Sequence, residues 1–299
     1  MRRARRRQGR ARSSDGTTRN AGTLGRRDRT RERRLPDIRI ATYNVRSARD
    51  DRRALVRVIR AIRPDVLCVQ EAPALPGRRR RLARDAGMTI AAGERPVSAR
   101  LAGVAVLTGP AVRLLHAEQR RLRWFPGLEP RAVALAVVEK DGLRLVVCSF
   151  HLDLHRGARL RHAAEIMPIA DRLARLFGAH AVLCGDVNEE PAGPTWRYLA
   201  SRFTDCYAKA PKGDGGTYSA RRPAKRIDGI FAAPELTVAR CGAADAAPAD
   251  LVAATDHRPV VADLCGRRSG EGTGEGPAER SGEEQGEGSG GTSAAGSAG

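Results

Sequence analysis

Side chains that could do chemistry recur in the sequence after, within or just before several apolar runs. These side chains are Asn44, Glu71, His151, Asp186, Asn188, Asp228, Asp256 and His257. Carboxylate and amide oxygens suit a hard cation such as Mg²⁺ or Mn²⁺, and imidazoles can donate to a phosphate or move a proton. Hydrolysis of phosphate esters is among the slowest uncatalysed reactions, and a metal with several fixed donors is the usual way to accelerate it. The residue types therefore favour metal-dependent cleavage of a phosphate ester.

The stretch AVLCGDVNEEP, residues 181–191, shows the pattern most clearly. Its apolar half predicts a buried strand, and its polar half places Asp186 and Asn188 directly after that strand. Taken alone, the polar half is also typical of an ordinary turn. A calcium loop is excluded because it needs glycine where this chain has Pro191. We expect Glu189 and Glu190 to belong to the loop that follows.

The elements that must position these residues are short strands separated by helices and hairpins. Strands are predicted at 38–45, 65–70, 103–108, 132–139, 143–150, 181–185, 226–232 and 259–264. Asp141-Gly142 predicts a hairpin between two of them. Strand ends in a layered α/β fold converge on one rim, which is where sites form. A recurrence of polar residues at so many strand ends therefore indicates one shared site.

Helices are predicted from apolar residues at a spacing of three and four. The first has Leu55, Val58, Ile59 and Ile62 on one face and ends at Pro64. A basic helix follows at about 78–86, where we expect Arg78–Arg81 to form a solvated face. A long helix at 157–177 is expected to turn Leu160, Ala164, Met167 and Leu173 inward and to be kinked at Pro168. A short helix begins at Pro194.

The number of strands, about ten or more, is too large for one open sheet. The chain mixes βαβ units with hairpins, which favours mixed sheets. The predicted fold class is α/β, with two mixed sheets packed face to face and helices outside.

Composition divides the 299 residues into three parts. Residues 1–35 hold fourteen Arg and no Lys, and residues 266–299 are rich in Gly, Ser and Glu. Neither end can bury enough apolar surface to offset chain entropy, so both are predicted to be disordered tails around a catalytic domain at 36–265. The formal net charge of +20 suggests a polyanionic partner such as nucleic acid, although the codon bias of a GC-rich genome would also favour arginine without any functional demand.

The remaining sequence features concern membrane segments, the cellular compartment and the oligomeric state. No apolar run is long enough for a transmembrane segment, and none follows the basic N-terminus as in a signal peptide. The six cysteines are scattered, without a C-x-x-C pair, which favours a reduced cytoplasmic protein and argues against structural zinc. We expect a monomer.

The segments TYNVRS, VQEAP, GVAVLT, SFHLD, CGDVNEEP, RIDGIF and TDHRPVVADL together resemble the endonuclease/exonuclease/phosphatase superfamily, which has the deoxyribonuclease I-like fold. The resemblance covers almost all of 37–265, in the order and spacing of the family. It implies a four-layer α/β sandwich and cleavage of phosphate esters by direct attack of water, with Mg²⁺ or Mn²⁺ as cofactor.

The same resemblance implies a role for each candidate residue. Glu71 resembles the principal metal carboxylate, with Asn44 and Asp256 supporting the metal side. His151 and Asn188 resemble the groups that hold the phosphate, and Asp186 resembles the group that orients or deprotonates the water. His257 resembles the catalytic imidazole, oriented by Asp228.

Substrate choice stays open at this point. Abasic-site endonucleases carry an acidic residue where this chain has Arg46. A nuclease on DNA or RNA is the first interpretation. The second is a lipid or small-molecule phosphoesterase, and the third is a basic nucleic-acid-binding protein without activity. Trp124 and Phe125 could stack a base, insert in lipid or pack on the core. Of the remaining histidines, we expect His155 in a loop and His162 on a helix surface.

Overall fold

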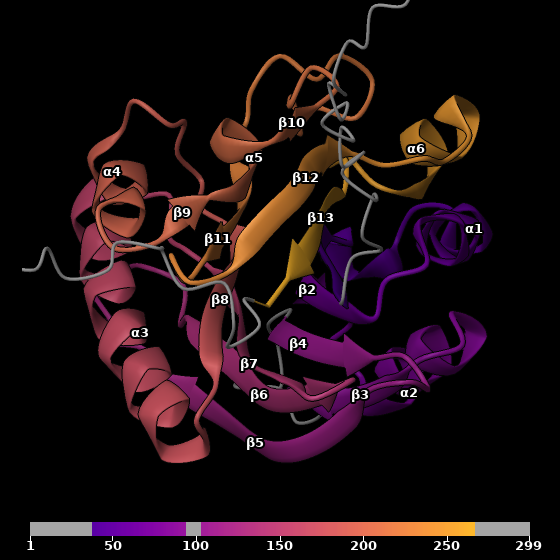
Figure 1. Ribbon diagram of the computed structural model, residues 1–299. Helices are drawn as coiled ribbons and strands as arrows, with labels where there is room; N and C mark the ends of the chain where they lie inside the picture. The colour runs from indigo at the N-terminus through magenta and orange to yellow at the C-terminus, as the bar shows by residue number, and fades with distance from the viewer. Residues whose placement is uncertain (1–37, 94–102, 267–299) are drawn as a thin grey trace, which may run out of the picture. The chain divides into compact units, whose positions relative to one another are not determined.

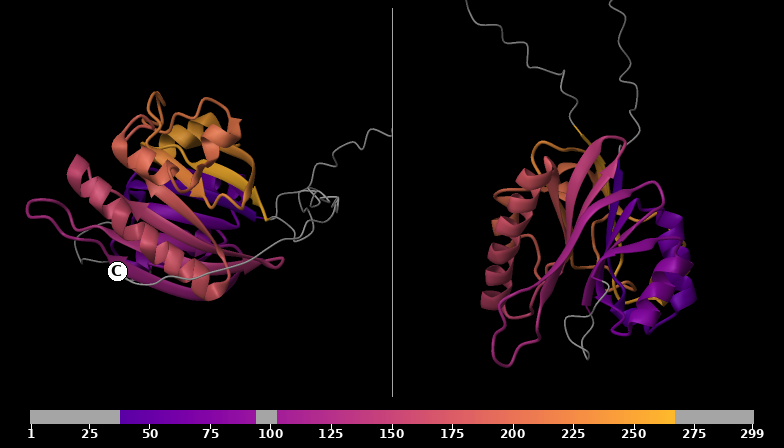
Figure 2. Two further views of the ribbon diagram at one scale, coloured as in Figure 1. Left: turned by 60° about the vertical axis from the view of Figure 1, so that its left-hand side comes forward. Right: turned by 90° about the horizontal axis from the view of Figure 1, so that it is seen from below.

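The computed structural model describes residues 38–93 and 103–266, which all lie in one compact unit, Pro36–Gly299. Two mixed β-sheets pack face to face, and helices cover their outer faces (Figures 1 and 2). The predicted four-layer α/β sandwich is therefore confirmed. The arginine-rich N-terminal tail and the Gly/Ser/Glu-rich C-terminal tail fall outside the described residues, apart from Gly266.

The first sheet has seven strands in the order β10-β12-β13-β1-β2-β4-β3. Their bounds are β1 Ile38–Asn44, β2 Val66–Ala72, β3 Thr89–Ala92, β4 Gly103–Thr108, β10 Pro211–Lys212, β12 Thr237–Ala243 and β13 Val260–Cys265. Strand β1 is central, parallel to β2 and antiparallel to β13. The end of β1 therefore lies beside the end of β2 and the start of β13.

The second sheet has six strands in the order β5-β6-β7-β8-β11-β9. Their bounds are β5 Arg113–Arg121, β6 Ala132–Lys140, β7 Leu143–His151, β8 His180–Asp186, β9 Thr204–Asp205 and β11 Asp228–Ala232. The predicted hairpin joins β6 and β7, and both Asp141 and Gly142 have the positive φ that such a turn requires. Strand β7 is parallel to β8, and β11 is antiparallel to it. The last residue of β8, Asp186, therefore pairs with the first residue of β11, Asp228.

Six α-helices and a short 3₁₀ turn complete the described chain. Their bounds are η1 Arg46–Ala48, α1 Arg52–Ile62, α2 Pro76–Asp85, α3 Arg156–Phe177, α4 Pro194–Ala200, α5 Cys206–Lys209 and α6 Pro248–Ala254. Helix α3 runs along the outer side of the six-stranded sheet, and α1 and α2 lie outside the seven-stranded sheet (Figure 2). Three apolar clusters hold these layers together, one between the sheets and one under the helices on each side.

Helix α1 folds as predicted, because Leu55, Val58, Ile59 and Ile62 are all buried. Asp51 begins this helix, and its side chain accepts from the backbone N–H groups of Arg53 and Ala54. Helix α3 agrees with the prediction only in part: Met167 and Leu173 are buried, but the rest of the buried face differs. Leu160 is 36% exposed, whereas the polar residues Arg159 and His162 are buried. These two polar side chains can be buried because they have partners, Glu189 for Arg159 and the carbonyl of Arg123 for His162.

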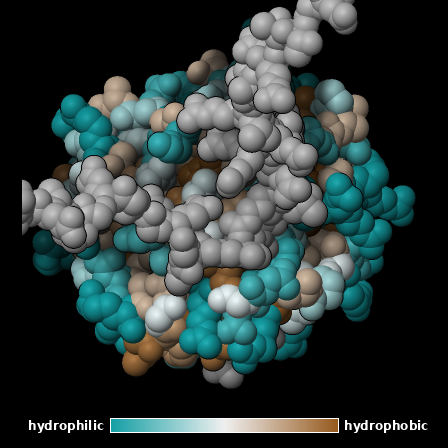
Figure 3. All heavy atoms as spheres, in the orientation of Figure 1, coloured by the Kyte–Doolittle hydropathy of each residue, from teal (hydrophilic) through white to brown (hydrophobic). Residues whose placement is uncertain are grey.

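Several elements were not predicted from the sequence, among them β5, β12 and α6. Strand β5 has an edge position and a half-exposed, polar sequence, so it lacks the apolar run of a buried strand. Strand β12 and helix α6 are short, and only a few of their residues are buried. Outside the grey atoms, the face in Figure 3 is mainly hydrophilic, with scattered apolar residues.

The six cysteines are free thiols, and all are buried. Burial raises the pKa of the Cys148 and Cys241 thiols well above the usual range, which makes them unreactive. Within 38–93 and 103–266, no helix has the length and apolarity to cross a membrane.

Candidate active site

His257 and Asp228 form a buried hydrogen-bonded pair between the two sheets. The Nδ1–H of His257 donates to Oδ2 of Asp228 at 2.9 Å, and the carboxylate is 1% exposed. Asp228 begins β11, and His257 lies three residues before β13. The bond therefore fixes the orientation of the ring and stabilises its protonated form.

Asp186 lies at the centre of the candidate residues. Its Oδ2 is 3.6 Å from Nε2 of His151 and 3.8 Å from Nε2 of His257. His151 stands beside it because β7 and β8 are parallel and pair in register at these positions. Asp186 is 1% exposed, so two imidazoles and a carboxylate share a space almost free of solvent.

Asn44 connects this centre to Glu71. Its Nδ2 donates to Oε1 of Glu71 and to Oδ2 of Asp186, in each case at 3.1 Å. Its Oδ1 accepts from the backbone N–H of Arg46 at 3.1 Å. The amide of Asn44 thus fixes the spacing of two carboxylates that would otherwise repel each other.

A bulge at the end of β2 directs Glu71 to the rim. The pairing between β2 and β4 shifts register between Val69 and Ala72, and Glu71 has φ 47°. A left-handed glutamate is strained, and such strain persists where the surrounding structure enforces it, commonly at functional sites. The irregular backbone therefore marks the end of β2 as a site.

Asn188 is held in a tight turn directly after β8. Its backbone N–H donates to Oδ1 of Asp186 at 2.9 Å, and its Nδ2 donates to the carbonyl of Leu152 at 3.0 Å. The ordinary-turn interpretation of this stretch is thus correct in geometry, because Asp186 does close a turn onto Asn188. The same turn places Asp186 beside His151 and Asn188 beside the backbone of Leu152, which follows it.

Asp256 lies at the edge of the group rather than at its centre. Its Oδ1 accepts from the hydroxyl of Thr255 at 3.3 Å, and its Oδ2 is 3.4 Å from Nε of Arg46. The hydroxyl of Thr255 also donates to the carbonyl of Asn44, which ties the two chain segments together. That Asp256 helps to bind the metal remains a prediction.

The two histidines have opposite electrostatic environments. Burial, with Arg131 and His257 adding to it, lowers the pKa of His151 to about 4 despite the Asp186 carboxylate. Burial opposes protonation of His257 as well, but the combined charges of Asp228, Asp186 and Asp256 and the hydrogen bond to Asp228 raise its pKa to about 9. At neutral pH and without a bound cation, His151 is therefore neutral and His257 is an imidazolium.

Burial is also the main cause that raises the pKa of Asp186, and the charge of Asp228 adds to it. A carboxylate with a raised pKa accepts a proton more readily, which suits a general base. The pairing of a neutral imidazole, an imidazolium and a basic carboxylate is typical of sites for proton transfer.

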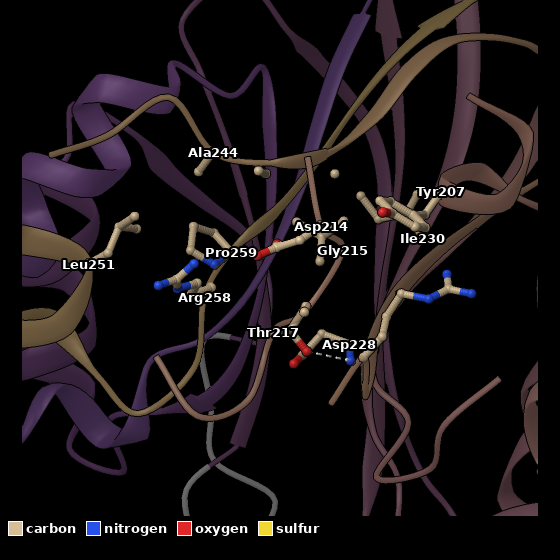
Figure 4. A pocket seen from close by; sticks show the side chains of 16 residues that line it. Tyr207, Asp214, Gly215, Thr217, Asp228, Ile230, Ala244, Leu251, Arg258 and Pro259 are labelled. Carbon is tan, nitrogen blue, oxygen red and sulfur yellow. Dashed lines mark hydrogen bonds between the residues drawn. The ribbon is translucent and has the colours of Figure 1, made fainter. Parts of the chain in front are cut away.

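Some supporting residues were not recognised from the sequence. Oγ1 of Thr217 accepts from the backbone N–H of Asp228 at 3.2 Å, and both residues line the pocket shown in Figure 4. Thr217 and Asp228 are eleven residues apart, and no motif links them, so only the fold reveals this contact.

The expectation that Glu189 belongs only to a loop is wrong. Its Oε1 accepts from the backbone N–H groups of Thr195 and Trp196, and its Oε2 forms an ion pair with Arg159 at 2.9 Å. The residue therefore joins the turn after Asp186 to α4 and α3. Glu190 is exposed, in agreement with its predicted place in the loop.

Further sequence expectations had mixed outcomes. His155 begins α3, and its Nδ1 accepts from the N–H of Ala158, so it has a structural role. His162 is buried rather than on a surface. The predicted solvated face of Arg78–Arg81 is correct except at Arg79, since the other three arginines are exposed. Arg79 is 2% exposed and donates to the carbonyls of Pro73 and Gly93.

Comparison with protein families shows to which family the chain belongs. The model of the Endonuclease/Exonuclease/phosphatase family matches residues 41–257, a span that contains all eight candidate residues. The chain belongs to the endonuclease/exonuclease/phosphatase family. It is therefore a phosphoesterase, and its buried Asp186, Asp228 and His257 form a group whose ligand atoms lie within 4.8 Å of one another.

Solved structures of this family have the same fold. An endonuclease/exonuclease/phosphatase from Bacteroides vulgatus is 19% identical, with a TM-score of 0.63 over 77% of this chain and 99% of that one. Mannosyl-6-phosphatase Bt3783 of Bacteroides thetaiotaomicron is 19% identical, with a TM-score of 0.64 over 76% and 99%. The human Nocturnin catalytic domain with bound sulfate is 18% identical, with a TM-score of 0.60 over 78% and 96%. No curated protein matches the chain.

Proposed function

We propose that the protein is a divalent-metal-dependent phosphodiesterase that acts on nucleic acid. The observation that supports this most directly is the continuous set of contacts from Glu71 through Asn44 to Asp186, and from Asp186 to both histidines. It joins a carboxylate suited to a cation with the groups needed for proton transfer. The net charge of +20 favours a polyanionic substrate over a neutral one.

The donor set fits a hard divalent cation. Glu71, Asp186 and Asp256 offer carboxylate oxygens, and Oδ1 of Asp228 is buried without a hydrogen-bond partner among the described residues. Cysteine sulfurs, which would favour a softer metal, lie in the apolar clusters instead. We assign Mg²⁺ or Mn²⁺ to Glu71, Asn44 and Asp256, where the bound ion would offset charge on the phosphate oxygens.

Each remaining residue has one task in hydrolysis. Neutral His151 and the amide of Asn188 donate hydrogen bonds to the phosphate oxygens. Asp186 accepts a proton from the attacking water, whose oxygen forms the new bond to phosphorus. The bond from phosphorus to one ester oxygen breaks, and the imidazolium of His257, held by Asp228, stabilises the negative charge that develops.

A small-molecule phosphatase is the second candidate, since one structure of similar fold is a mannosyl-6-phosphatase. A lipid phosphoesterase would use the same catalytic group, whereas a non-catalytic nucleic-acid-binding protein would not need it. The buried and complete catalytic group argues against loss of activity, because a buried carboxylate oxygen without a hydrogen-bond partner, such as Oδ1 of Asp228, costs stability when it serves no function.

The test is hydrolysis by the full chain of single-stranded DNA, RNA, a sugar phosphate, a phosphoinositide and sphingomyelin, with Mg²⁺ or Mn²⁺ and with excess chelator. We expect nucleic acid to be cleaved, chelator to abolish cleavage, and Asp186→Ala or His257→Ala to be inactive but folded. Full activity in chelator or in either variant would refute the proposal. Faster turnover of the sugar phosphate or of a lipid would favour a phosphatase or a lipid phosphoesterase instead.

We also propose a monomer in a reducing compartment. Six buried free thiols support the reducing compartment, which we take to be the cytoplasm, since disulfides persist where the surroundings are oxidising.

A further inference from the structure

Helix α2 carries a concentration of positive charge on its outer face. Its sequence, PGRRRRLARD, contains five arginines and one carboxylate, Asp85. Arg79 is buried, whereas Arg78, Arg81 and Arg84 are exposed to solvent. The side chains of Arg81 and Arg84 are 63% and 77% exposed. The proposed hydrolysis uses none of these arginines.

The single carboxylate of this helix is shared among several arginines. Asp85 forms its closest ion pair with Arg52 of α1. Nε of Arg81 lies 3.9 Å from Oδ2 of Asp85, and Nε of Arg84 lies 3.6 Å from its Oδ1. Three guanidinium groups therefore share one negative charge.

The charges of α2 are unfavourable for the helix itself. Arg81 is three residues from both Arg78 and Arg84, a spacing at which like charges on a helix surface repel each other. Leu75 precedes the first turn and makes no side-chain hydrogen bond to it, and the first turn has no acidic residue. A polyanion along the outer face would offset the repulsion between the arginines. The electrostatics of the helix therefore favour an anionic partner.

A groove of about 550 Å³ adjoins the end of α2, and among the described residues no carboxylate lines it. Arg80 and Arg84 contribute to its lining, and Met88, Ile90 and Pro110 form apolar walls. Ile90 belongs to β3, the edge strand beside α2 (Figure 1). A groove of this size accommodates one nucleotide, with its base on the apolar walls and its phosphate at the arginines. Only a single strand can place a base there, because a duplex keeps its bases stacked inside.

The groove differs from another basic pocket of the molecule. That pocket is lined by Arg39, Lys212 and Arg240, but also by Asp245. Lys212 donates to Asp245, and Asp263 accepts from both Arg39 and Arg240. The charges of that pocket are therefore compensated within the protein, and it is the weaker candidate for an anionic partner.

Helix α2 connects the catalytic edge to this groove. Only residues 73–75 separate the end of β2, where Glu71 lies, from the start of α2. The other end of α2 leads into β3, whose Thr89 lies level with Val66 at the start of β2, since both pair with Thr108. The helix therefore runs from the catalytic edge to the opposite end of the sheet. At 1.5 Å for each of its ten residues it spans roughly 15 Å, the length of about four nucleotides.

We infer that the outer face of α2 and the adjoining groove bind the phosphate backbone of single-stranded nucleic acid as the strand leaves the catalytic edge. The inference deepens the proposed function and rests on it for the choice of nucleic acid. A membrane is a poorer partner, because an interfacial helix turns apolar side chains toward lipid, whereas Leu82 and Ala83 of α2 are buried in the protein. Contacts with phosphates carry no sequence information, so this surface raises affinity for long strands without selecting a base sequence.

The test compares a long and a short substrate of the full chain. The long one is oligothymidylate of about 30 nucleotides, several times the length of α2. The short one is the p-nitrophenyl ester of thymidine 5′-phosphate, which occupies the catalytic site alone. The readouts are the Kd of oligothymidylate in excess chelator, its dependence on salt, and kcat/KM for both substrates with Mg²⁺ or Mn²⁺.

Three double variants separate the role of α2 from that of net charge. Arg81→Gln/Arg84→Gln removes two charges from α2, and Arg81→Lys/Arg84→Lys keeps them. Arg172→Gln/Arg175→Gln is the matched control, since it removes two exposed arginines from α3 on the other side of the sandwich. Thermal melting of each variant shows whether the fold is intact.

We expect Arg81→Gln/Arg84→Gln to bind oligothymidylate about tenfold more weakly and to lower the slope of log Kd against log salt by about 1.4, since each phosphate contact with a single strand contributes about 0.7. Its kcat/KM should fall for oligothymidylate and stay unchanged for the nucleotide ester. The lysine variant should bind like the wild type because the positive charges remain. The control variant of α3 should also bind like the wild type.

Different failures have different meanings. Wild-type affinity in Arg81→Gln/Arg84→Gln would overturn the inference, and so would an equal loss in the control variant of α3, which would reflect net charge alone. Loss of binding to phosphatidylserine vesicles with unchanged affinity for oligothymidylate would overturn it in favour of a membrane contact. Binding of oligothymidylate that depends on the two arginines, without hydrolysis of either substrate, would refute the proposed function and support the inferred surface.

Discussion

His257 donates from Nδ1 to Asp228 across 2.9 Å, and this bond joins the start of β11 in one sheet to the segment before β13 in the other. The sandwich is therefore closed at its catalytic edge by a charged hydrogen bond. Because the carboxylate helps to raise the pKa of His257 to about 9, packing of the sheets and protonation of the imidazole are linked.

Asp228→Asn should remove this link. An amide does not stabilise an imidazolium, so the pKa of His257 should fall from about 9, and kcat should fall by about a hundredfold or more. The pH profile of kcat measured on single-stranded DNA checks both effects. Asp245→Asn, which alters an exposed carboxylate, is the control, and an unchanged profile in Asp228→Asn would contradict the assignment.

Asn44→Ala should weaken the metal site. Loss of its amide removes the contact that holds Glu71 and Asp186 at a fixed spacing, so the Mg²⁺ concentration for half-maximal activity should rise by about 10 to 100 times. Titration of activity with Mg²⁺ measures this. Thr42→Ser, which keeps the hydroxyl that bonds to Gln70, should titrate like the wild type. A loss of kcat with an unchanged Mg²⁺ dependence would argue against this role.

Stability of the metal-free protein should depend on His257 in a defined pH window. The pKa of this group is raised in the folded state to about 9, so its stabilisation is complete below the unfolded pKa of roughly 6.5 and is lost as the pH rises through 9. The difference in unfolding free energy between the wild type and His257→Gln should fall by about 3 kcal/mol over this range. Urea unfolding in excess chelator at pH 6 and pH 9.5 tests this, and parallel behaviour of the two proteins would disprove it.

Glu189 and its neighbour Glu190 form a matched pair for testing structure. Glu189→Gln leaves Arg159 as a buried, uncompensated cation and should lower the unfolding free energy by about 3 kcal/mol. Glu190→Gln changes an exposed residue and should stay within about 0.5 kcal/mol. Chemical denaturation at pH 7 measures both, and equal effects would show that the ion pair does not hold α3 to the turn after β8.

The strongest sequence predictions concerned buried strands and one amphipathic helix. Apolar runs such as 103–108 and the spacing of Leu55, Val58, Ile59 and Ile62 follow directly from the geometry of strands and helices. Polar elements carried no such signal. Strand β5 and the inner face of α3 were missed or misplaced because polar residues there are exposed at an edge or buried with partners.

The sequence by itself determined the family, the two-sheet fold and the eight candidate residues, because each of these residues follows or precedes an apolar run. Only the tertiary structure decided their electrostatics. His151 and His257 are the same residue type, and the sequence offers no reason to separate them. Burial without a hydrogen-bonded carboxylate lowers the pKa of His151, whereas contact with Asp228 raises the pKa of His257.

The structure also decided what surrounds the site. Thr217 and Glu189 act through partners that are distant in the chain, and no local sequence pattern encodes such contacts. AVLCGDVNEEP thus contains two kinds of information. Its apolar half specifies a strand through local periodicity, whereas the tasks of Asp186, Asn188 and Glu189 depend on which strands end beside them.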